Sequence, residues 1–152
     1  MRKLIIPICF LFTGLQLFSQ SENPRYDSTL AKSLGADEYG MKSYILVVLK
    51  SGPNNITDQA RLDILFKGHM KNIQDLADQG KLIVAGPFGK NAKSYRGIFI
   101  LNVKTPQEAE VSLAKDPAIR DKVFEPDILE WYGSAALGEY LKVHERIEKK
   151  SF

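Results

Sequence analysis

The sequence predicts an α+β domain with one four-stranded antiparallel sheet. Four short apolar runs, each bounded by turn residues, are typical of strands. Two segments with apolar residues at helical spacing separate the first run from the second and the third from the fourth. The chain has 152 residues, of which 44% are apolar and 26% charged, as in a single globular unit. The predicted order is β-α-β-β-α-β, followed by one extra C-terminal helix.

The first 20 residues have a different character from the rest. Arg2 and Lys3 give a basic start, and residues 4–18 form a mostly apolar run without charge. Ser19 and Ser21 supply small residues at the −3 and −1 positions of a cleavage site. This layout predicts a signal peptide over residues 1–20, and hence a periplasmic or secreted protein. Since the apolar run is shorter than the ~20 residues that span a bilayer, we expect no stable membrane span after cleavage; an uncleaved anchor is the alternative.

Cysteine content and charge exclude several classes of function. Cys9, the chain's one cysteine, lies within the predicted signal peptide, so the mature chain has no disulfide, thiol nucleophile or cysteine metal site. Loss of Arg2 and Lys3 reduces the 21 basic residues to 19, against 18 acidic ones, which is a net charge of +1. So small a charge argues against binding nucleic acid or anionic lipid.

The N-terminal half begins with a polar linker. Residues 21–41 have too few apolar side chains for a core, although Asp27 as cap and Gly35 as stop favour one or two helical turns between them. Residues 43–50, SYILVVLK, are a continuous apolar run that suits a strand buried on both faces.

The first helix is predicted over residues 57–79, with Thr57 as its N-cap and Gly80 as its left-handed stop. Its apolar residues form one stripe: Leu62, Leu65, Phe66, Ile73, Leu76 and Ala77. The position seven residues after Leu62, which belongs to the same stripe, is His69. An ionisable ring on a buried stripe requires an explanation.

The second and third strands are predicted over residues 81–85 and 96–103, with Gly86-Pro87 ending the former. A capping box begins the second helix, with Thr105 at the N-cap, proline at N1 and glutamate at N3. Asp116 continues the inward stripe of this helix, which we expect to end there because a proline follows.

The fourth strand is predicted over residues 123–131. Pro126 cannot donate to a strand ladder, which indicates an edge position or a bulge. Residues 135–150 have the pattern of one amphipathic helix, whose stripe is Leu137, Tyr140, Leu141, His144 and Ile147.

This order of elements is the ferredoxin-like arrangement, with two helices on one face of the sheet. The other face is also expected to be apolar, because the first and third strands are apolar almost throughout. We therefore predict a homodimer formed through the sheet, with two-fold symmetry.

Six short motifs resemble the YCII-related domain. In chain order they are FKGHM from Phe66, GKL from Gly80, AGPF from Ala85, RGIF from Arg96, DPA from Asp116 and WYG from Trp131. The resemblance covers about residues 42–133, with residues 134–152 as a C-terminal helical extension. It implies the dimeric α+β barrel fold, which pairs ferredoxin-like units through their sheets.

The resemblance also implies a pocket with a histidine and an aspartate, which correspond to His69 and Asp116. Most family members have no assigned reaction, and a few resemble lyases or dehydrochlorinases that act on hydroxylated aromatic rings. The export signal and the added C-terminal helix depart from the typical member and argue against a cytoplasmic catabolic role.

A histidine beside a carboxylate in a half-buried pocket can take a proton from a substrate, while the carboxylate orients the ring. Each residue also has a structural interpretation. His69 is then a core histidine bonded to backbone or water, and Asp116 caps the turn before residues 118–122. Asp75 and Asp78 are weaker partners for His69, since offsets of six and nine do not make neighbours on a helix.

Other site residues follow from position. Gly86 and Pro87 are expected at the pocket rim in a tight turn; no GK[ST] follows, so this is not a phosphate loop. Arg96 is predicted to bind an anionic substrate group, with a surface salt bridge as the alternative. We expect no metal site, because His69 and Asp116 lack further ligands, and no cofactor.

These observations favour a small exported lyase- or isomerase-type enzyme that uses His69 and Asp116 on a small cyclic or phenolic substrate. The alternative is a non-catalytic small-molecule-binding or interaction module, in which His69 is structural.

Overall fold

The computed structural model describes residues 23–150. Its elements are α1 (Ser28–Leu34), β1 (Met41–Ser51), α2 (Gln59–Asp78), β2 (Leu82–Pro87), β3 (Tyr95–Leu101), α3 (Pro106–Leu113), α4 (Pro117–Arg120), β4 (Phe124–Ser134), the 3-10 helix η1 (Ala135–Tyr140) and α5 (Leu141–Ile147). The predicted signal peptide, residues 1–20, lies outside this range. Within it, no helix has both the length and the apolar character needed to cross a bilayer.

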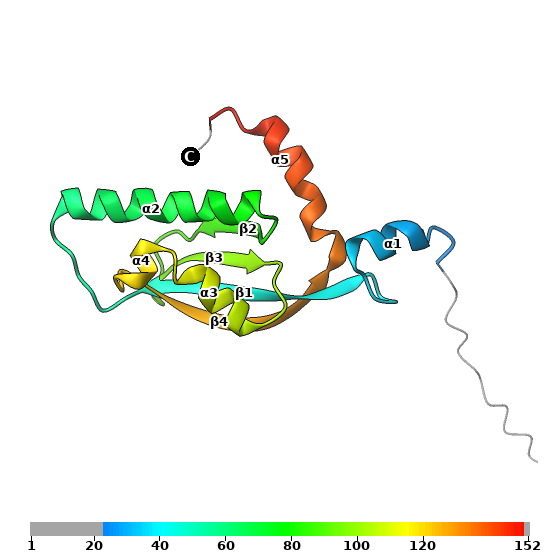
Figure 1. Cartoon of the computed structure of the whole chain (residues 1–152), viewed down its shortest axis with the longest axis horizontal. Helices are drawn as coiled ribbons and strands as arrows, with labels where there is room; N and C mark the ends of the chain where they lie inside the picture. Colours follow the sequence, from blue (N-terminus) through cyan, green and yellow to red (C-terminus); the bar gives the residue numbers. More distant parts are fainter. Residues whose placement is uncertain (1–22, 151–152) are drawn as a thin grey trace, which may run out of the picture.

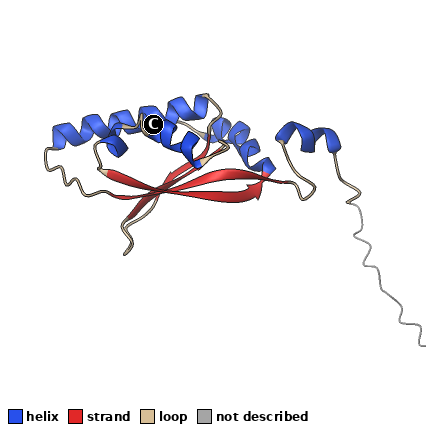
Figure 2. Ribbon diagram, turned by 60° about the horizontal axis from the view of Figure 1, so that its bottom comes forward, coloured by secondary structure: helices blue, strands red, loops and turns tan. Residues whose placement is uncertain are grey.

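The four strands form one sheet in the order β2-β3-β1-β4, and all three neighbouring pairs are antiparallel. The long helix α2 runs along one side of this sheet, with α3 and α4 beside it (Figures 1 and 2). This confirms the predicted α+β, ferredoxin-like architecture. β4 is an edge strand, as Pro126 indicated. An edge strand pairs on one side only, so it tolerates a residue that has no N–H to donate.

The core lies between the sheet and the helices. Alternate residues of β1 point into it, and they pack with side chains from β3, α2 and α3: Ile45, Val47, Leu49, Leu76, Phe99, Leu101 and Leu113. The intervening residues form the other face of the sheet. There Leu46 pairs with Ile100 and with Leu129 of β4, and Leu129 is 51% exposed. This second face is therefore apolar but only partly covered.

Two predicted element ends were wrong. Asp58, not Thr57, caps α2, since its carboxylate accepts hydrogen bonds from the amides of Ala60 and Arg61. Gly86 and Pro87 do not end β2, because both still pair with β3. Three further strands differ from the prediction at both ends: β1 and β4 are longer, and β3 is shifted toward the N-terminus. Ladder pairing continues into residues that lack a strong strand pattern of their own. The helix expected to end at Asp116 ends at Leu113, because Asp116 caps the separate helix α4.

The single helix predicted over residues 135–150 was also wrong. The segment forms η1 and then a separate short helix, α5, which stands away from the sheet in Figure 1. Anchors at the two ends of η1 explain the tight turn. Ala135 is buried, and the Tyr140 hydroxyl donates a 2.5 Å hydrogen bond to the Ile83 carbonyl. The expected stripe is not buried, since Ile147 is 73% exposed.

The helical turns predicted after Asp27 are confirmed as α1. The Asp27 carboxylate accepts from the amides of Thr29 and Leu30, and Gly35 ends the helix at φ 70°. A hydrogen bond from the Tyr132 hydroxyl to the Asp37 carboxylate then ties this N-terminal segment to β4.

Candidate functional site

His69 lies in the middle of α2 and faces the sheet. It is 8% exposed. Its ring stacks on that of Phe99 at an interplanar angle of 30°, with centroids 6.0 Å apart. It meets the ring of Phe124 in a T-shaped contact, with centroids 5.2 Å apart. These contacts hold the imidazole in one orientation, which a group that transfers protons requires.

Asp116 is completely buried in the turn between α3 and α4. Its Oδ1 accepts hydrogen bonds from the amides of Ala118 at 2.9 Å and Ile119 at 3.3 Å, and so caps α4. Its Oδ2 lies 2.6 Å from Nδ1 of His69. The two interpretations of Asp116 from sequence are therefore compatible, because one oxygen caps the turn while the other contacts the histidine.

This contact determines which nitrogen of His69 is available. A carboxylate only accepts, so Nδ1 of His69 carries a proton; in the neutral ring, Nε2 then has the free lone pair. Nε2 has no hydrogen-bond partner within residues 23–150. Nε2 is not fully buried either, because the one unpartnered side-chain nitrogen or oxygen in that range that is fully buried is Nδ2 of Asn72. Nε2 is therefore accessible, and it can accept a proton from a bound molecule.

A glycine allows the two residues to meet. A Cβ on Gly68 would lie 2.4 Å from Cγ of Pro117, which is closer than atoms can pack. Gly68 directly precedes His69, and Pro117 directly follows Asp116. The absence of a side chain at residue 68 lets α2 and α4 approach and brings the imidazole within reach of the carboxylate.

A cavity of about 410 Å³ opens in front of His69. Apolar and aromatic side chains from α2, β1, β3 and β4 form most of its wall: Leu49, Phe66, Met70, Ile73, Phe99 and Phe124. Ala85, Gly86, Pro87, Arg96 and Gly97 complete the lining with His69. The structure thus brings the predicted substrate-binding residues to the cavity that His69 lines, with Asp116 behind the ring.

Arg96 supplies the positive charge of this cavity. Its side chain is exposed and forms no ion pair within residues 23–150, contrary to the salt bridge considered from sequence. Its carbonyl accepts from the amide of Phe88, which fixes the turn between β2 and β3. The guanidinium is thus free to bind an anionic group.

The two other aspartates considered for His69 are engaged elsewhere. Asp75 binds Lys71 at 2.6 Å, and Asp78 accepts from Gln74 at 2.8 Å. Within residues 23–150 no group of three or more histidine, cysteine, aspartate or glutamate side chains is arranged to hold a metal ion.

Sequence reasoning missed two contributors to the site. Phe124 packs against His69, although it starts the strand that is farthest from it in sequence; only the pairing of β4 with β1 brings it there. Gly68 carried a signal that could have been read, because a glycine inside an otherwise regular helix pattern often marks a close approach.

No family model matches the chain, and no curated protein matches it. Among solved structures, the chain is similar to 5-chloro-2-hydroxyhydroquinone dehydrochlorinase from Burkholderia phenoliruptrix, in complex with 2,5-dihydroxybenzoquinone. The two are 22% identical with a TM-score of 0.43, over 58% of this chain and 92% of the other. At this identity and TM-score, the likeness assigns neither a family nor an activity.

Proposed function

We propose that this protein is a small enzyme of the lyase or isomerase type, in which His69 is the general base and Asp116 orients it. The observation that carries the proposal is the 2.6 Å contact between His69 Nδ1 and Asp116 Oδ2, made by a ring whose other nitrogen is accessible beside a cavity. A buried aspartate that serves only as a cap does not need this second contact.

The residues have distinct roles in proton transfer. Nε2 of His69 takes a proton from a hydroxyl group, or from a carbon next to a carbonyl, and the imidazolium formed is stabilised by Asp116 Oδ2. The proton then returns at another atom of the substrate, which is isomerisation, or leaves together with a departing group, which is elimination. A positioned base typically contributes about 10²–10⁴-fold to such a rate.

The lining of the cavity indicates the substrate class. Its volume of about 410 Å³ accommodates one substituted ring, and the rings of Phe66, Phe99 and Phe124 offer aromatic contacts. Arg96 supplies a positive charge for the oxygen that becomes anionic when the proton leaves. A small cyclic or phenolic molecule with an acidic hydroxyl matches this combination.

A chromogenic phenol tests the proposal without knowledge of the natural substrate. A nitrophenol absorbs visible light when it loses its proton, so binding next to Nε2 of His69 should raise the phenolate signal. His69→Gln should abolish this rise, and His144→Gln on the exposed helix α5 is the matched control that should keep it. An unchanged signal in His69→Gln would overturn the proposal.

The packing of the His69 ring between Phe99 and Phe124 favours a second candidate, a non-catalytic binding module with a structural histidine. The same titration separates the two candidates. A module of this kind binds the nitrophenol in its neutral form, and His69→Gln then lowers thermal stability without changing the absorbance of the bound probe.

A homodimer through the sheet is part of the proposal. The partly covered aliphatic residues on the face opposite the helices support it, since an apolar sheet face needs a second layer. Ile100→Asp on this face should reduce the molar mass measured by light scattering to that of one chain. Ile64→Asp, at an exposed apolar position of α2, is the matched control.

We also propose that the protein is an exported member of the YCII-related group. The motif residues support membership, because nine of them, from the motifs FKGHM, AGPF and RGIF, line one cavity. Mass spectrometry of the protein from its native cell tests export, since the mature chain should begin near residue 22. Recovery of the intact chain from the cytoplasm would contradict export and leave the proposed chemistry unaffected.

A further inference from the structure

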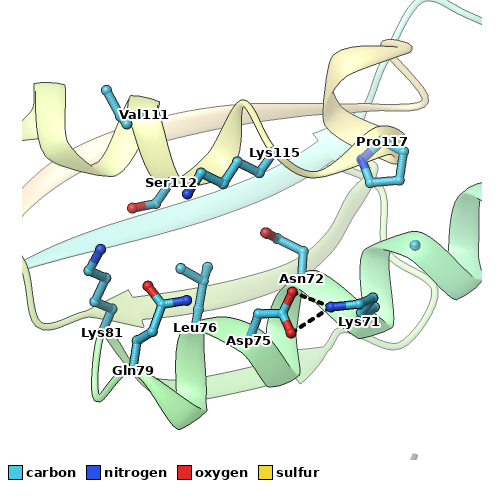
Figure 3. Close-up of a pocket in the computed structure, with 11 residues that line it drawn as sticks. Lys71, Asn72, Asp75, Leu76, Gln79, Lys81, Val111, Ser112, Lys115 and Pro117 are labelled. Carbon is cyan, nitrogen blue, oxygen red and sulfur yellow. Dashed lines mark hydrogen bonds and ion pairs between the residues drawn. The ribbon is translucent and has the colours of Figure 1, made fainter.

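A second cavity lies on the other side of α2, between α2 and α3 (Figure 3). It measures about 370 Å³, and polar side chains form much of its lining. None of its lining residues also lines the His69 cavity, so the two are separate spaces on either side of one helix.

A buried amide faces this second cavity. Asn72 is 6% exposed, and its Nδ2 is the buried side-chain atom that has no hydrogen-bond partner within residues 23–150. In Figure 3 its Oδ1 points from α2 toward α3. Half a turn about the bond to the carboxamide exchanges the two ends and presents the N–H group to the cavity. A buried donor without a partner indicates that something else accepts its hydrogen bond.

Two lysines supply unpaired positive charge at the same place. Lys81 and Lys115 line the cavity and form no ion pair within residues 23–150, whereas Lys71 at its edge binds Asp75. Figure 3 shows that the amino groups of Lys81 and Lys115 extend toward the hydroxyl of Ser112. The two ammonium groups and the Ser112 hydroxyl therefore lie toward one region of the cavity, where a negative group would be favoured.

Apolar side chains border this region. Leu76, which is 3% exposed, lies beneath it, and Val111, which is 67% exposed, forms its outer edge. A neighbouring hollow of about 340 Å³ shares Lys81, Val111 and Ser112 and continues along α3. A ligand with a carbon skeleton would cover Val111 while its charged group contacts the lysines.

We propose that the space between α2 and α3 is a binding site for a small organic anion. Its carboxylate or phosphate group accepts hydrogen bonds from Asn72, Lys81 and Lys115, and its short apolar part lies on Leu76 and Val111. This site is independent of the proposed general base, so either can fail without the other.

Two probes with the same tail, butyrate and butyl phosphate, distinguish the sources of the negative group. Each is titrated into the full mature chain while ¹H–¹⁵N NMR follows the side-chain amide of Asn72 and the backbone amides of Ser112 and Lys115, which also report binding in a variant without Asn72. One probe should shift these signals in a saturable manner. Lys115→Met should weaken that binding about tenfold, as expected on loss of one charge-assisted hydrogen bond.

The controls separate a built site from general attraction to the surface. Lys67→Met removes the same charge at an exposed residue of α2 that lines neither cavity, and it should leave the affinity unchanged. Asn72→Leu should weaken binding without loss of the folded NMR spectrum. The proposal is overturned if neither probe binds, if Lys67→Met has the same effect as Lys115→Met, or if Asn72→Leu binds as tightly as the original chain.

Discussion

Helix α2 separates two cavities of similar size and opposite character. The cavity of about 410 Å³ is mostly apolar, and its buried polar pair, His69 and Asp116, is hydrogen-bonded. The cavity of about 370 Å³ is more polar, and Asn72, one turn after His69, has a buried amide without a partner. Two buried polar residues of one helix can thus have different roles. The role of each depends on whether the facing element supplies a hydrogen-bond partner.

The facing elements explain the contrast. α4 approaches α2 closely at Gly68, so a carboxylate reaches His69. Farther along, α3 faces α2 across open space, and Ser112 donates its hydroxyl proton to the carbonyl of Glu108. No acceptor within residues 23–150 satisfies Asn72 Nδ2, and an incoming ligand can.

Removal of the buried carboxylate should have the largest effect. Asp116→Ala leaves His69 and the amides of Ala118 and Ile119 without their acceptor, and we expect a loss of about 3–5 kcal/mol in the free energy of unfolding, measured with urea. Asp58→Ala is the control, because Asp58 caps α2 at the surface and has no buried partner. That control should lose about 1 kcal/mol. Equal losses in the two variants would show that Asp116 acts only as a cap.

Replacement of each polar residue of α2 by leucine should change stability in opposite directions. His69→Leu leaves Asp116 Oδ2 buried without a donor, and we expect a loss of about 3 kcal/mol. Asn72→Leu removes a buried amide that has no partner, so we expect a gain of about 1 kcal/mol. Thermal and urea unfolding measure both. A change of the same sign would show that the two cavities do not differ as described.

A methyl group at residue 68 should disturb the close approach of α2 and α4. Gly68→Ala places a Cβ against Pro117, which costs about 1–3 kcal/mol, while the better helix propensity of alanine returns about 0.5–1 kcal/mol. We therefore expect a net loss of about 1 kcal/mol and a weaker nitrophenol signal at His69. Pro117→Ala makes room, so the double variant should be more stable than the two separate losses predict. Simple additivity would contradict the steric explanation.

The smallest effect is expected at the surface, outside both cavities, where the carboxylate of Asp37 accepts a hydrogen bond from the Tyr132 hydroxyl. The hydrogen bond from Tyr132, with a second from the Met41 amide, lowers the pKa of Asp37 below its ordinary 3.8. The same bond from the other side raises the pKa of Tyr132 from 10 to about 12. The stability that comes from the lowered pKa of Asp37 is complete above pH 3.8 and is lost as the pH falls below that value. The stability that comes from the raised pKa of Tyr132 is complete below pH 10 and is lost as the pH rises toward 12.

Tyr132→Phe removes this pair and should lower the melting temperature slightly at neutral pH. The difference from the original chain should shrink in strong acid and in strong base, because the pair is then lost in both proteins. Ligand binding at the two cavities should be unchanged. A difference that stays constant at every pH would show that the Tyr132 hydroxyl contributes by packing alone.

Local chemistry made much of the fold predictable. The stripe of α2, the Thr105 cap of α3 and Pro126 at a sheet edge each depend on neighbours within a few residues, and the structure has all three. Of the predicted capping box only the Thr105 bond forms, since the Glu108 carboxylate accepts from the amide of Lys104 instead of Thr105. The C-terminal segment was not predictable in this way. Its helical pattern continues over residues 135–150, but contacts of η1 with Ile83, far earlier in the chain, impose a tighter turn.

The candidate site likewise has features that depend on local residues and features that depend on long-range contacts. Local spacing and proline geometry were enough to predict that His69 is buried on a helix facing the sheet and that a turn follows Asp116. The contact between these two side chains, 47 residues apart, and the packing of Phe124 against the ring depend on the assembled domain. So does the lack of a partner within residues 23–150 for Nδ2 of Asn72, on the same helix. Contacts between distant segments depend on how closely helices approach, and that distance is set by packing of the whole domain, as at Gly68 and Pro117.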